Sequence, residues 1–399
     1  MISVEEARSR ILAGLQPVAS EIIGLTQAHG RVLARPVEAR LTVPPADVSA
    51  MDGYALRAAD ATQGTVLKLI GEAPAGHPFT GQVNAGEAVR LFTGSVVPNG
   101  ADAVLIQENT TAQGHEVKVN EPVALGKNIR RAGQDFKAGD LILSAGKRLS
   151  IRDIGLAGAA GHPWLCVYRR PRVAILCTGD EIALPGEPVP TGGIANSNAA
   201  MLAAFVEAHG GEPLLLPIAR DTQDEVAAGA RAARGADLLI TTGGASVGAH
   251  DLVQVGLAQQ GFTLDFWKIA MRPGKPLIFG YVQDMPMLGL PGNPVSAYVC
   301  ATLFLGAALA ALGGLPFRAP RFETARLAAP MKVNDQREDY VRALLDQDEA
   351  GWLVTPLPVQ DSSMLSALSR AGALIRRLPH APAAEAGALV EVLLMEQKD

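Results

Sequence analysis

The chain contains very little cysteine. Only Cys166, Cys177 and Cys300 occur in 399 residues, and no two of them have a Cys-x-x-Cys spacing. Because three cysteines cannot pair completely, the sequence argues against a disulfide scaffold and against a zinc site, and it fits a reducing cytoplasm. The first fifteen residues lack the apolar stretch of a signal peptide. Ser3 and Glu6 have instead the spacing of a helix N-terminus.

An excess of basic residues is also lacking. The formal net charge at pH 7 is -5, which argues against a nucleic-acid-binding protein. Hydrophobic residues make up 48% and charged residues 19% of the chain, a balance typical of globular rather than disordered proteins. If the ligand is an anion, its positive field must therefore be local.

Long apolar runs are almost absent, with one exception. No charged residue occurs from 285 to 317. This run opens with Gly-Asn-Pro, is dominated by Ala and Gly, and has no basic flank at its start. We interpret it as a helix buried in a large α/β core rather than as the alternative, a membrane span.

The rhythm of apolar and turn residues divides the chain into parts. Continuous apolar runs that alternate with helical stretches predict a doubly wound, mainly parallel α/β sheet, whereas short runs broken by Gly and Pro predict β-domains. Ser150 and Asp153 mark a second capped helix, which we expect to pack near the first. The expected parts are a helical base formed by 1–45 and 142–172, an inserted β-domain at 46–141, an α/β domain at 173–319 and a C-terminal β-domain at 320–399.

Three glycine-rich loops follow buried strands of the predicted α/β domain. Ligands of open α/β sheets bind at the carboxyl ends of the strands, and glycines let backbone N–H groups approach a phosphate. We therefore predict that the loops bind an anionic, phosphate-bearing small molecule, although Gly is also the ordinary turn residue. In the third loop, Asn293 suits an N-cap and Pro294 the first helical position. The candidate binding residues are Thr178, Gly179 and Asp180 in the first loop, Gly243, Gly244, Ser246 and Gly248 in the second, and Pro291, Gly292, Asn293 and Ser296 at the third.

Carboxylates stand close to these loops in the sequence. A phosphate beside carboxylates usually needs a bridging cation, and Mg²⁺ prefers oxygen ligands. Glu181 and Asp251 are the stronger metal or catalytic candidates. Asp180 and Asp221 precede helix-like stretches, so capping of those helices is an equal alternative for both.

A basic turn lies at 268–276, with the sequence KIAMRPGKP. Lys268, Arg272 and Lys275 surround its Pro-Gly, and we favour anion binding over a solvated surface turn.

A second polar set occurs far upstream. It comprises Asp52 before a glycine, Thr93 in LFTGS, and Arg130 and Arg131 in NIRRAG. A turn at Asp52 and a solvated edge at the arginines are the alternatives.

Seven motifs become specific when they are taken together and in order: SAMDGYA, FTGSVVPNGADAVLIQE, IRRAGQDF, TGDEI, TTGGASVGAHD, MRPGKP and GLPGNPVSA. With them the chain resembles the molybdopterin molybdenumtransferase family, the MoeA-type enzymes, which also includes the gephyrin E domain. The resemblance covers nearly the whole chain.

The resemblance implies a fold and an activity. The fold is a helical base, an inserted β-domain, a molybdopterin-binding-type α/β domain and a C-terminal β-barrel-like domain. The activity is insertion of molybdate into adenylylated molybdopterin, which gives molybdenum cofactor and releases AMP with the help of Mg²⁺. Family members are homodimers whose site lies between the α/β domain of one subunit and the inserted β-domain of the other. Molybdopterin adenylyltransferase and other proteins of the cofactor pathway are possible partners.

The resemblance also assigns residues, matched motif by motif. Catalytic roles fall to Asp52, Thr93, Glu181, Asp221, Asp251 and Lys275, and the metal ligands are Glu181, Asp221 and Asp251. In the C-terminal domain REDYVRA and QDSSMLSAL resemble family motifs and give Arg337, Arg342, Ser362 and Ser363. The chain departs from the family there, because Gln336 replaces a Gly and Ala371-Gly372-Ala373 replaces Ala-Asn-Gly.

Two other functions are alternatives. One is a molybdopterin adenylyltransferase, but the second loop reads Ser-Val-Gly-x-x-Asp rather than the TGGTG type of that family. The other is a scaffold like the gephyrin E domain, which binds peptide segments of receptors.

Overall fold

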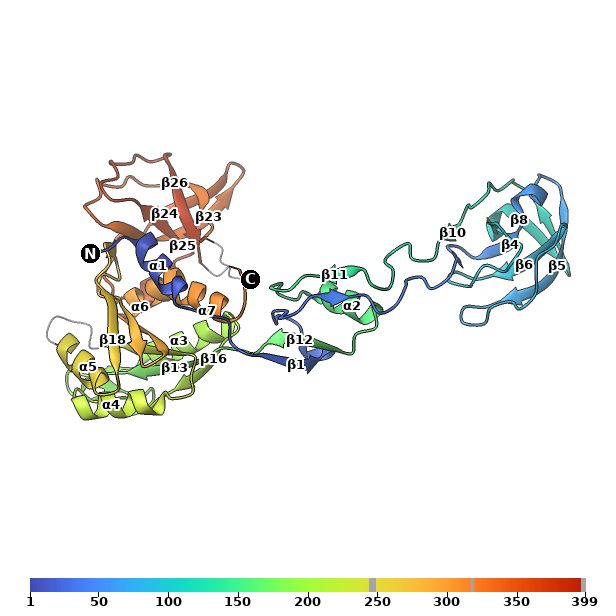
Figure 1. Cartoon of the computed structure of the whole chain (residues 1–399). Coiled ribbons are helices and arrows are strands. Elements are labelled where there is room, and N and C mark those ends of the chain that lie inside the picture. The colour runs from blue at the N-terminus through green and yellow to red at the C-terminus, as the bar shows by residue number, and fades with distance from the viewer. Residues whose placement is uncertain (244–248, 317–318, 396–399) are drawn as a thin grey trace. The chain divides into compact units, whose positions relative to one another are not determined.

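The computed structural model describes residues 1–243, 249–316 and 319–395. The chain forms two compact units (Figure 1). Unit 1 comprises Met1–Glu21, Gly30–Ala34 and Val167–Asp399, and unit 2 comprises Ile22–His29 and Arg35–Cys166. Short strands β1 (Ser20–Gly24) and β12 (Trp164–Tyr168), which pair with each other, lie where the chain passes from one unit to the other.

A six-stranded sheet forms the centre of unit 1. Its order is β16-β13-β17-β21-β20-β18; the first four strands are parallel, β20 pairs antiparallel with β21, and β18 pairs antiparallel with β20. The mainly parallel α/β sheet expected from the sequence is thus confirmed. The strands are β13 (Arg172–Cys177), β16 (Glu212–Leu215), β17 (Leu238–Thr242), β18 (Phe262–Trp267), β20 (Ile278–Val282) and β21 (Met285–Leu290).

Helices cover both faces of this sheet because successive strand side chains point to opposite sides. Val173 and Ile175 of β13 pack in one core with α1, α3, α6 and α7, whereas Ala174 and Leu176 pack in a second core with α4 and α5. These helices are α1 (Val4–Ala13), α3 (Ser197–Ala208), α4 (Gln223–Ala232), α5 (Ala249–Ala258), α6 (Pro294–Cys300) and α7 (Gly306–Leu312).

A π-helical segment, Ala301–Leu305, joins α6 to α7. The resulting helix, Pro294–Leu312, is long and apolar enough to cross a membrane, but 67% of its most apolar window is buried. Val295, Phe304 and Leu309 lie in the core with the sheet. The interpretation of this run as a core helix is therefore confirmed.

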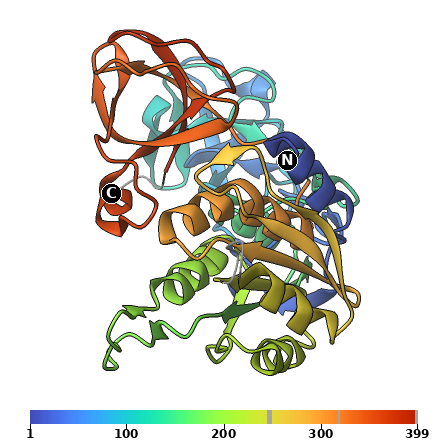
Figure 2. The same cartoon turned by 90° about the vertical axis from the view of Figure 1, so that its left-hand side faces the viewer.

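The C-terminal part of unit 1 is a closed β-barrel (Figure 2). Its strands pair in the order β23-β24-β22-β26-β25, and β25 pairs with β23 to complete the ring. The two-residue strand β19 (Met271–Arg272), which comes from the α/β part of the sequence, adds to β23 in parallel. The other elements are β22 (Glu323–Leu327), β23 (Glu338–Asp348), β24 (Gly351–Pro356), α8 (Leu365–Arg370), β25 (Ala373–Arg377) and β26 (Leu389–Leu394).

Unit 2 contains a six-stranded sheet with the order β7-β4-β6-β5-β9-β8. Two small pairings, β10 with β3 and β11 with β2, lie outside that sheet. The strands are β2 (Val37–Glu38), β3 (Val48–Ser49), β4 (Gly53–Leu56), β5 (Val66–Ala73), β6 (Glu87–Leu91), β7 (Ala103–Ile106), β8 (Thr110–Gln113), β9 (Glu116–Val119), β10 (Ile129–Arg130) and β11 (Leu141–Leu143).

The helix caps predicted at Ser3 and Ser150 are present. The Ser3 hydroxyl accepts a hydrogen bond from the Glu6 N–H at 3.1 Å, and Ser150 and Asp153 form a reciprocal capping box. The first cap starts α1, which packs on α7 in unit 1, and the second starts α2 (Ile151–Ala159), which packs on β11 and on the 3-10 turn Leu25–Gln27 in unit 2. The two capped helices therefore belong to different units.

Candidate active site

The strands β13, β17 and β21 end at a cavity of about 860 Å³ within unit 1. Segments from the α/β sheet and from the C-terminal barrel line it together. Eleven of the residues predicted from the sequence are among them: Glu181, Gly243, Arg272, Lys275, Pro291, Gly292, Asn293, Ser296, Arg337, Ser362 and Ser363.

The glycine loops meet backbone to backbone at this cavity. Gly243 has φ +101°, and a Cβ placed there would lie 2.2 Å from the Thr178 carbonyl oxygen. A Cβ on Gly292 would lie 3.3 Å from the Cα of Gly243. Thr178 is fully buried beneath them, and its N–H donates to the Thr242 carbonyl at 2.9 Å. Thr178 thus supports the cavity wall. Thr178, Gly179 and Asp180 are not among the described residues that line the cavity, and their contact with the ligand stays a prediction.

The third loop is joined to the barrel domain. Asn293 occupies the N-cap position of α6, but its side chain does not cap the helix as the sequence predicted. Its amide donates instead to the Ser362 hydroxyl at 2.8 Å, and the Val295 N–H donates to the Ser362 carbonyl at 3.1 Å. The start of the helix and the segment at Ser362 therefore form one continuous wall.

Three cationic side chains, Arg272, Lys275 and Arg337, also line the cavity, and two of them are held by carboxylates. Asp335 accepts from the Arg337 guanidinium at 2.9 Å and from the Arg272 guanidinium at 3.2 Å. Arg272 also pairs with Asp339, which is 5% exposed. The hydrogen bonds from Arg337 lower the pKa of Asp335 to about 2, whereas burial raises the pKa of Asp339. Lys275, the third cation, is exposed.

Two basic residues predicted to bind substrate have other positions. Arg342 is 1% exposed, and its guanidinium donates to the carbonyls of Val359, Asp361 and Met364 at 3.5, 2.9 and 3.3 Å. It therefore shapes the segment that carries Ser362. Lys268 does not line the cavity, and its Nζ lies 3.4 Å from the centre of the Trp267 ring.

The carboxylates beside the first loop do not cap helices. Asn196 caps α3 and Thr222 caps α4, so the capping alternative for Asp180 and Asp221 is wrong. Each of these two carboxylates instead accepts the other residue's backbone N–H, at 3.2 and 3.4 Å. Among the described residues no group of three or more acidic, His or Cys side chains forms a metal cluster.

Part of the second loop lies outside the description of the structure. Gly244, Ser246 and Gly248 are outside the described residues. Asp251 lies on α5, but its side chain is likewise not described.

A second polar site lies in unit 2. The Asp52 carboxylate accepts the Thr93 N–H at 2.7 Å and the Thr93 hydroxyl at 2.9 Å. These bonds lower the pKa of Asp52, the backbone one contributing most. Arg90, which the sequence analysis missed, lies over the rings of Tyr54 and Phe92 and adds a positive charge.

The predicted arginines of unit 2 are exposed. Arg130 ends β10, whose partner strand carries Ser49, and the Ser49 carbonyl accepts the Gly94 N–H at 2.9 Å beside Thr93. Arg131 forms an ion pair with Asp47 at 2.5 Å.

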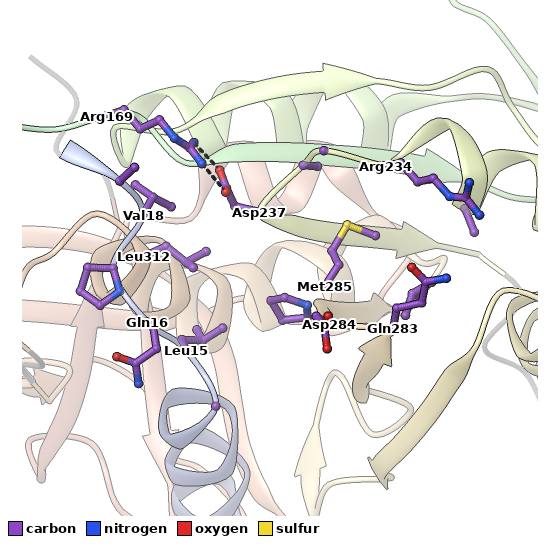
Figure 3. A pocket seen from close by; sticks show the side chains of 18 of the residues that line it. Leu15, Gln16, Val18, Arg169, Arg234, Asp237, Gln283, Asp284, Met285 and Leu312 are labelled. Carbon is purple, nitrogen blue, oxygen red and sulfur yellow. Dashed lines mark hydrogen bonds and ion pairs between the residues drawn. The ribbon is translucent and has the colours of Figure 1, made fainter. Parts of the chain in front are cut away.

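Another cavity of unit 1, of about 750 Å³, lies at the amino ends of β17 and β21 (Figure 3). Arg169 and Asp237 are joined at its edge by two hydrogen bonds of 2.6 Å, and Leu15, Met285 and Leu312 supply apolar walls. None of the site residues predicted from the sequence is among its described lining residues. The cavity at the carboxyl ends of the strands is therefore the stronger candidate.

Comparison with known proteins decides the family. Residues 2–161 match the model of the MoeA N-terminal region (domain I and II), 174–311 match that of a probable molybdopterin binding domain, and 324–395 match that of the MoeA C-terminal region (domain IV). The chain belongs to the MoeA family.

Relatives and solved structures agree with the MoeA assignment along the whole chain. A molybdopterin molybdenumtransferase of Haemophilus influenzae is 34% identical over 94% of each chain, and one of Bacillus subtilis is 32% identical over all of this chain and 95% of its own. The crystal structure of a molybdopterin biosynthesis MoeA protein of Pyrococcus horikoshii matches with a TM-score of 0.87 and 28% identity, and covers 100% of both chains.

In this MoeA chain, three cavity residues carried no sequence signal strong enough to single them out. Asn196, Asn198 and Thr242 line the cavity at the start of α3 and the end of β17. The Asn198 amide donates to the Thr242 hydroxyl at 2.8 Å and to the Gly292 carbonyl at 2.7 Å. The sequence ANSNAA at a predicted helix start, one residue after two glycines, is the available signal.

Proposed function

We propose that this protein inserts molybdate into adenylylated molybdopterin and releases AMP. Three relatives named molybdopterin molybdenumtransferase are 32 to 37% identical to it. The observation that carries the proposal is the cavity at the strand ends, where glycine loops face Arg272, Lys275 and Arg337. Molybdate is an oxyanion and the adenylylated pterin carries a pyrophosphate, so both require backbone N–H donors and cationic side chains.

The residues of the cavity contribute to substrate binding in different ways. The bare backbone at Gly243 and Gly292 allows close approach of a phosphate, and Lys275 supplies a mobile point charge to it. Arg272 and Arg337 are already oriented by Asp335, so little side-chain freedom is lost when they bind an oxyanion. Breaking the phosphoanhydride increases the negative charge on the departing AMP phosphate, which this cationic wall stabilises.

Mg²⁺ fits the acidic residues beside the cavity. The metal is usually held by one or two carboxylates together with substrate phosphates, and does not need an all-protein cage. Glu181 lines the cavity, and Asp221 stands beside it through its contact with Asp180. These two residues and Asp251 are the ligands that we propose, and the bound metal would neutralise pyrophosphate charge.

We infer that the active molecule is a cytoplasmic homodimer. All described residues that line the cavity belong to unit 1, whereas Asp52 and Thr93 belong to unit 2. By the family resemblance we propose that these two residues lie across the subunit interface, where Asp52 orients a water molecule or a metal-bound oxygen.

The activity is tested by molybdate-dependent release of AMP from adenylylated molybdopterin. We expect Lys275→Ala and Asp52→Ala each to lower the rate by about 100-fold or more. An unchanged rate in both variants, or no release by the unaltered protein, would refute the proposal.

Subunit complementation tests the shared site. A mixture of Asp52→Ala and Lys275→Ala chains that exchange subunits should recover activity, because a heterodimer has one intact composite site. If activity is recovered neither after mixing nor after refolding the two variants together, Asp52 and Lys275 act within one chain.

A further inference from the structure

One polar side chain of the cavity is almost completely buried and only partly hydrogen-bonded. Asn198 lies in the first turn of α3, lines the cavity and is 8% exposed. It does not cap the helix, because Asn196 performs that role by accepting the Ala199 N–H at 3.1 Å. The Asn198 side chain is therefore available for another task.

Hydrogen bonds fix the direction of the Asn198 amide. Its Nδ2 donates to the Gly292 carbonyl at 2.7 Å, and a carbonyl oxygen can only accept. The Thr242 hydroxyl donates to the Pro291 carbonyl at 3.2 Å and so accepts from the same Nδ2 at 2.8 Å. Both amide hydrogens are thus used on the second and third glycine loops, and the side chain cannot flip without losing both bonds.

The other end of the amide has no partner. Asn198 Oδ1 is buried and accepts no hydrogen bond from any described residue. A buried acceptor without a donor is costly, so this atom calls for a partner from outside the described chain. The residues that Asn198 contacts, Thr242 and Gly292, carry no charge, in contrast to Arg272 and Lys275 in the same cavity lining.

We propose that Asn198 is a specificity-determining residue whose Oδ1 accepts a hydrogen bond from an N–H group of the pterin ring. The inference rests on the proposed function, which supplies the pterin. It assigns the ring to the uncharged wall and leaves the anionic groups to the cationic one. A site built to pair with an N–H group rejects an analogue that lacks it, because the buried acceptor then remains unpaired.

The test measures binding of three probes to the full chain. They are pterin itself, pterin methylated on the ring amide nitrogen and pterin dimethylated on the exocyclic amine, with ring fluorescence as the signal. We expect the unaltered protein to bind one methylated probe about 30-fold or more weaker than pterin. In Asn198→Ala that preference should shrink to a few-fold, because the acceptor is gone, while affinity for molybdate changes much less.

Two further variants separate recognition from folding. Asn198→Ser also removes the amide but leaves a smaller cavity than Asn198→Ala does. This variant should likewise lose the preference for pterin over the methylated probe. Asn196→Asp keeps a side-chain acceptor for the helix cap and should retain it. Equal weakening of pterin and methylated pterin by Asn198→Ala would overturn the inference and leave a loop-positioning role. Pterin binding without any preference in the unaltered protein overturns this inference alone, whereas binding of neither pterin nor molybdate overturns the proposed function as well.

Discussion

The two polar sites of the molecule are built in opposite ways. In unit 1 the cavity is supported by buried groups: Thr178 is fully buried, and Asp339 and Arg342 are 5% and 1% exposed. In unit 2 the carboxylate of Asp52 is held by a single turn residue, Thr93, and the predicted arginines Arg130 and Arg131 are exposed.

The difference indicates how each site obtains its geometry. The cavity of unit 1 depends on contacts between segments far apart in the sequence, such as Arg342 with the chain at 359–364. The Asp52 site depends on local backbone bonds at its own turn. Substitutions in unit 1 should therefore cost stability, whereas those in unit 2 should mainly change the charge and orientation of one carboxylate.

The largest contrast is expected between two arginines. Arg342→Met leaves three carbonyl oxygens of the Ser362 segment without their donor and should cost about 4 kcal/mol of stability. Arg130→Met removes an exposed side chain and should cost less than about 0.5 kcal/mol. Hydrogen exchange of the backbone amides in β23 and in β10 measures the two stability changes. A small effect of Arg342→Met would show that the barrel segment is held by other contacts.

Two glycines make the next comparison. Gly243 and Gly94 both have positive φ, +101° and +87°, but only Gly243 faces backbone, at 2.2 Å, whereas Gly94 has open space. We expect Gly243→Ala to cost about 3 kcal/mol, since strain and collision add, and Gly94→Ala about 1 kcal/mol from strain alone. Chemical unfolding followed at the tryptophans of each unit gives the values. Equal costs would contradict the close packing of the loops.

Carboxylate titration gives a smaller contrast. Arg337→Met should raise the pKa of Asp335 from about 2 toward its ordinary value, because the largest cause of the lowering is lost. The native pair stabilises the fold above the ordinary carboxylate pKa, and this contribution disappears as the pH falls toward about 2. Carbon NMR of the labelled carboxylates measures the shift. An unchanged pKa would mean that the Arg337 backbone N–H alone holds Asp335.

The smallest effect is expected at Asp52. Thr93→Val removes the hydroxyl bond but leaves the backbone N–H, which is the larger cause of the lowered pKa. The pKa of Asp52 should therefore rise only part of the way to its ordinary value, in the same NMR experiment. Thr93→Ser keeps the hydroxyl and serves as the control; a full return to the ordinary value in Thr93→Val would show that the backbone bond is lost too.

The sequence predicted features that depend on local patterns. Buried strands, the caps at Ser3 and Ser150 and the core helix after Asn293 each follow from a short run of residues, and the structure confirms them. The α/β fold and the closed barrel are confirmed as well.

What the sequence failed to predict depends on distant neighbours. Capping was offered for Asp221, but Thr222 is one residue closer to the helix and performs it. The resemblance of REDYVRA to a family motif predicts a site role for Arg342, yet the hydrogen-bond partners of Arg342 lie 17 to 22 residues away along the chain. Asn198 and Arg90 were missed because an asparagine at a helix start or an arginine in a strand has no distinctive local pattern.

The short strand β19 affects the design of chimeras in which the C-terminal barrel is exchanged between relatives. Met271 and Arg272 lie between two strands of the α/β sheet in the sequence, but they extend β23 of the barrel, opposite Glu338 and Asp339. A boundary drawn near residue 320 would therefore separate a strand from its own partner. A chimera that exchanges barrels between relatives must therefore also exchange this dipeptide, or the barrel loses the strand that extends β23.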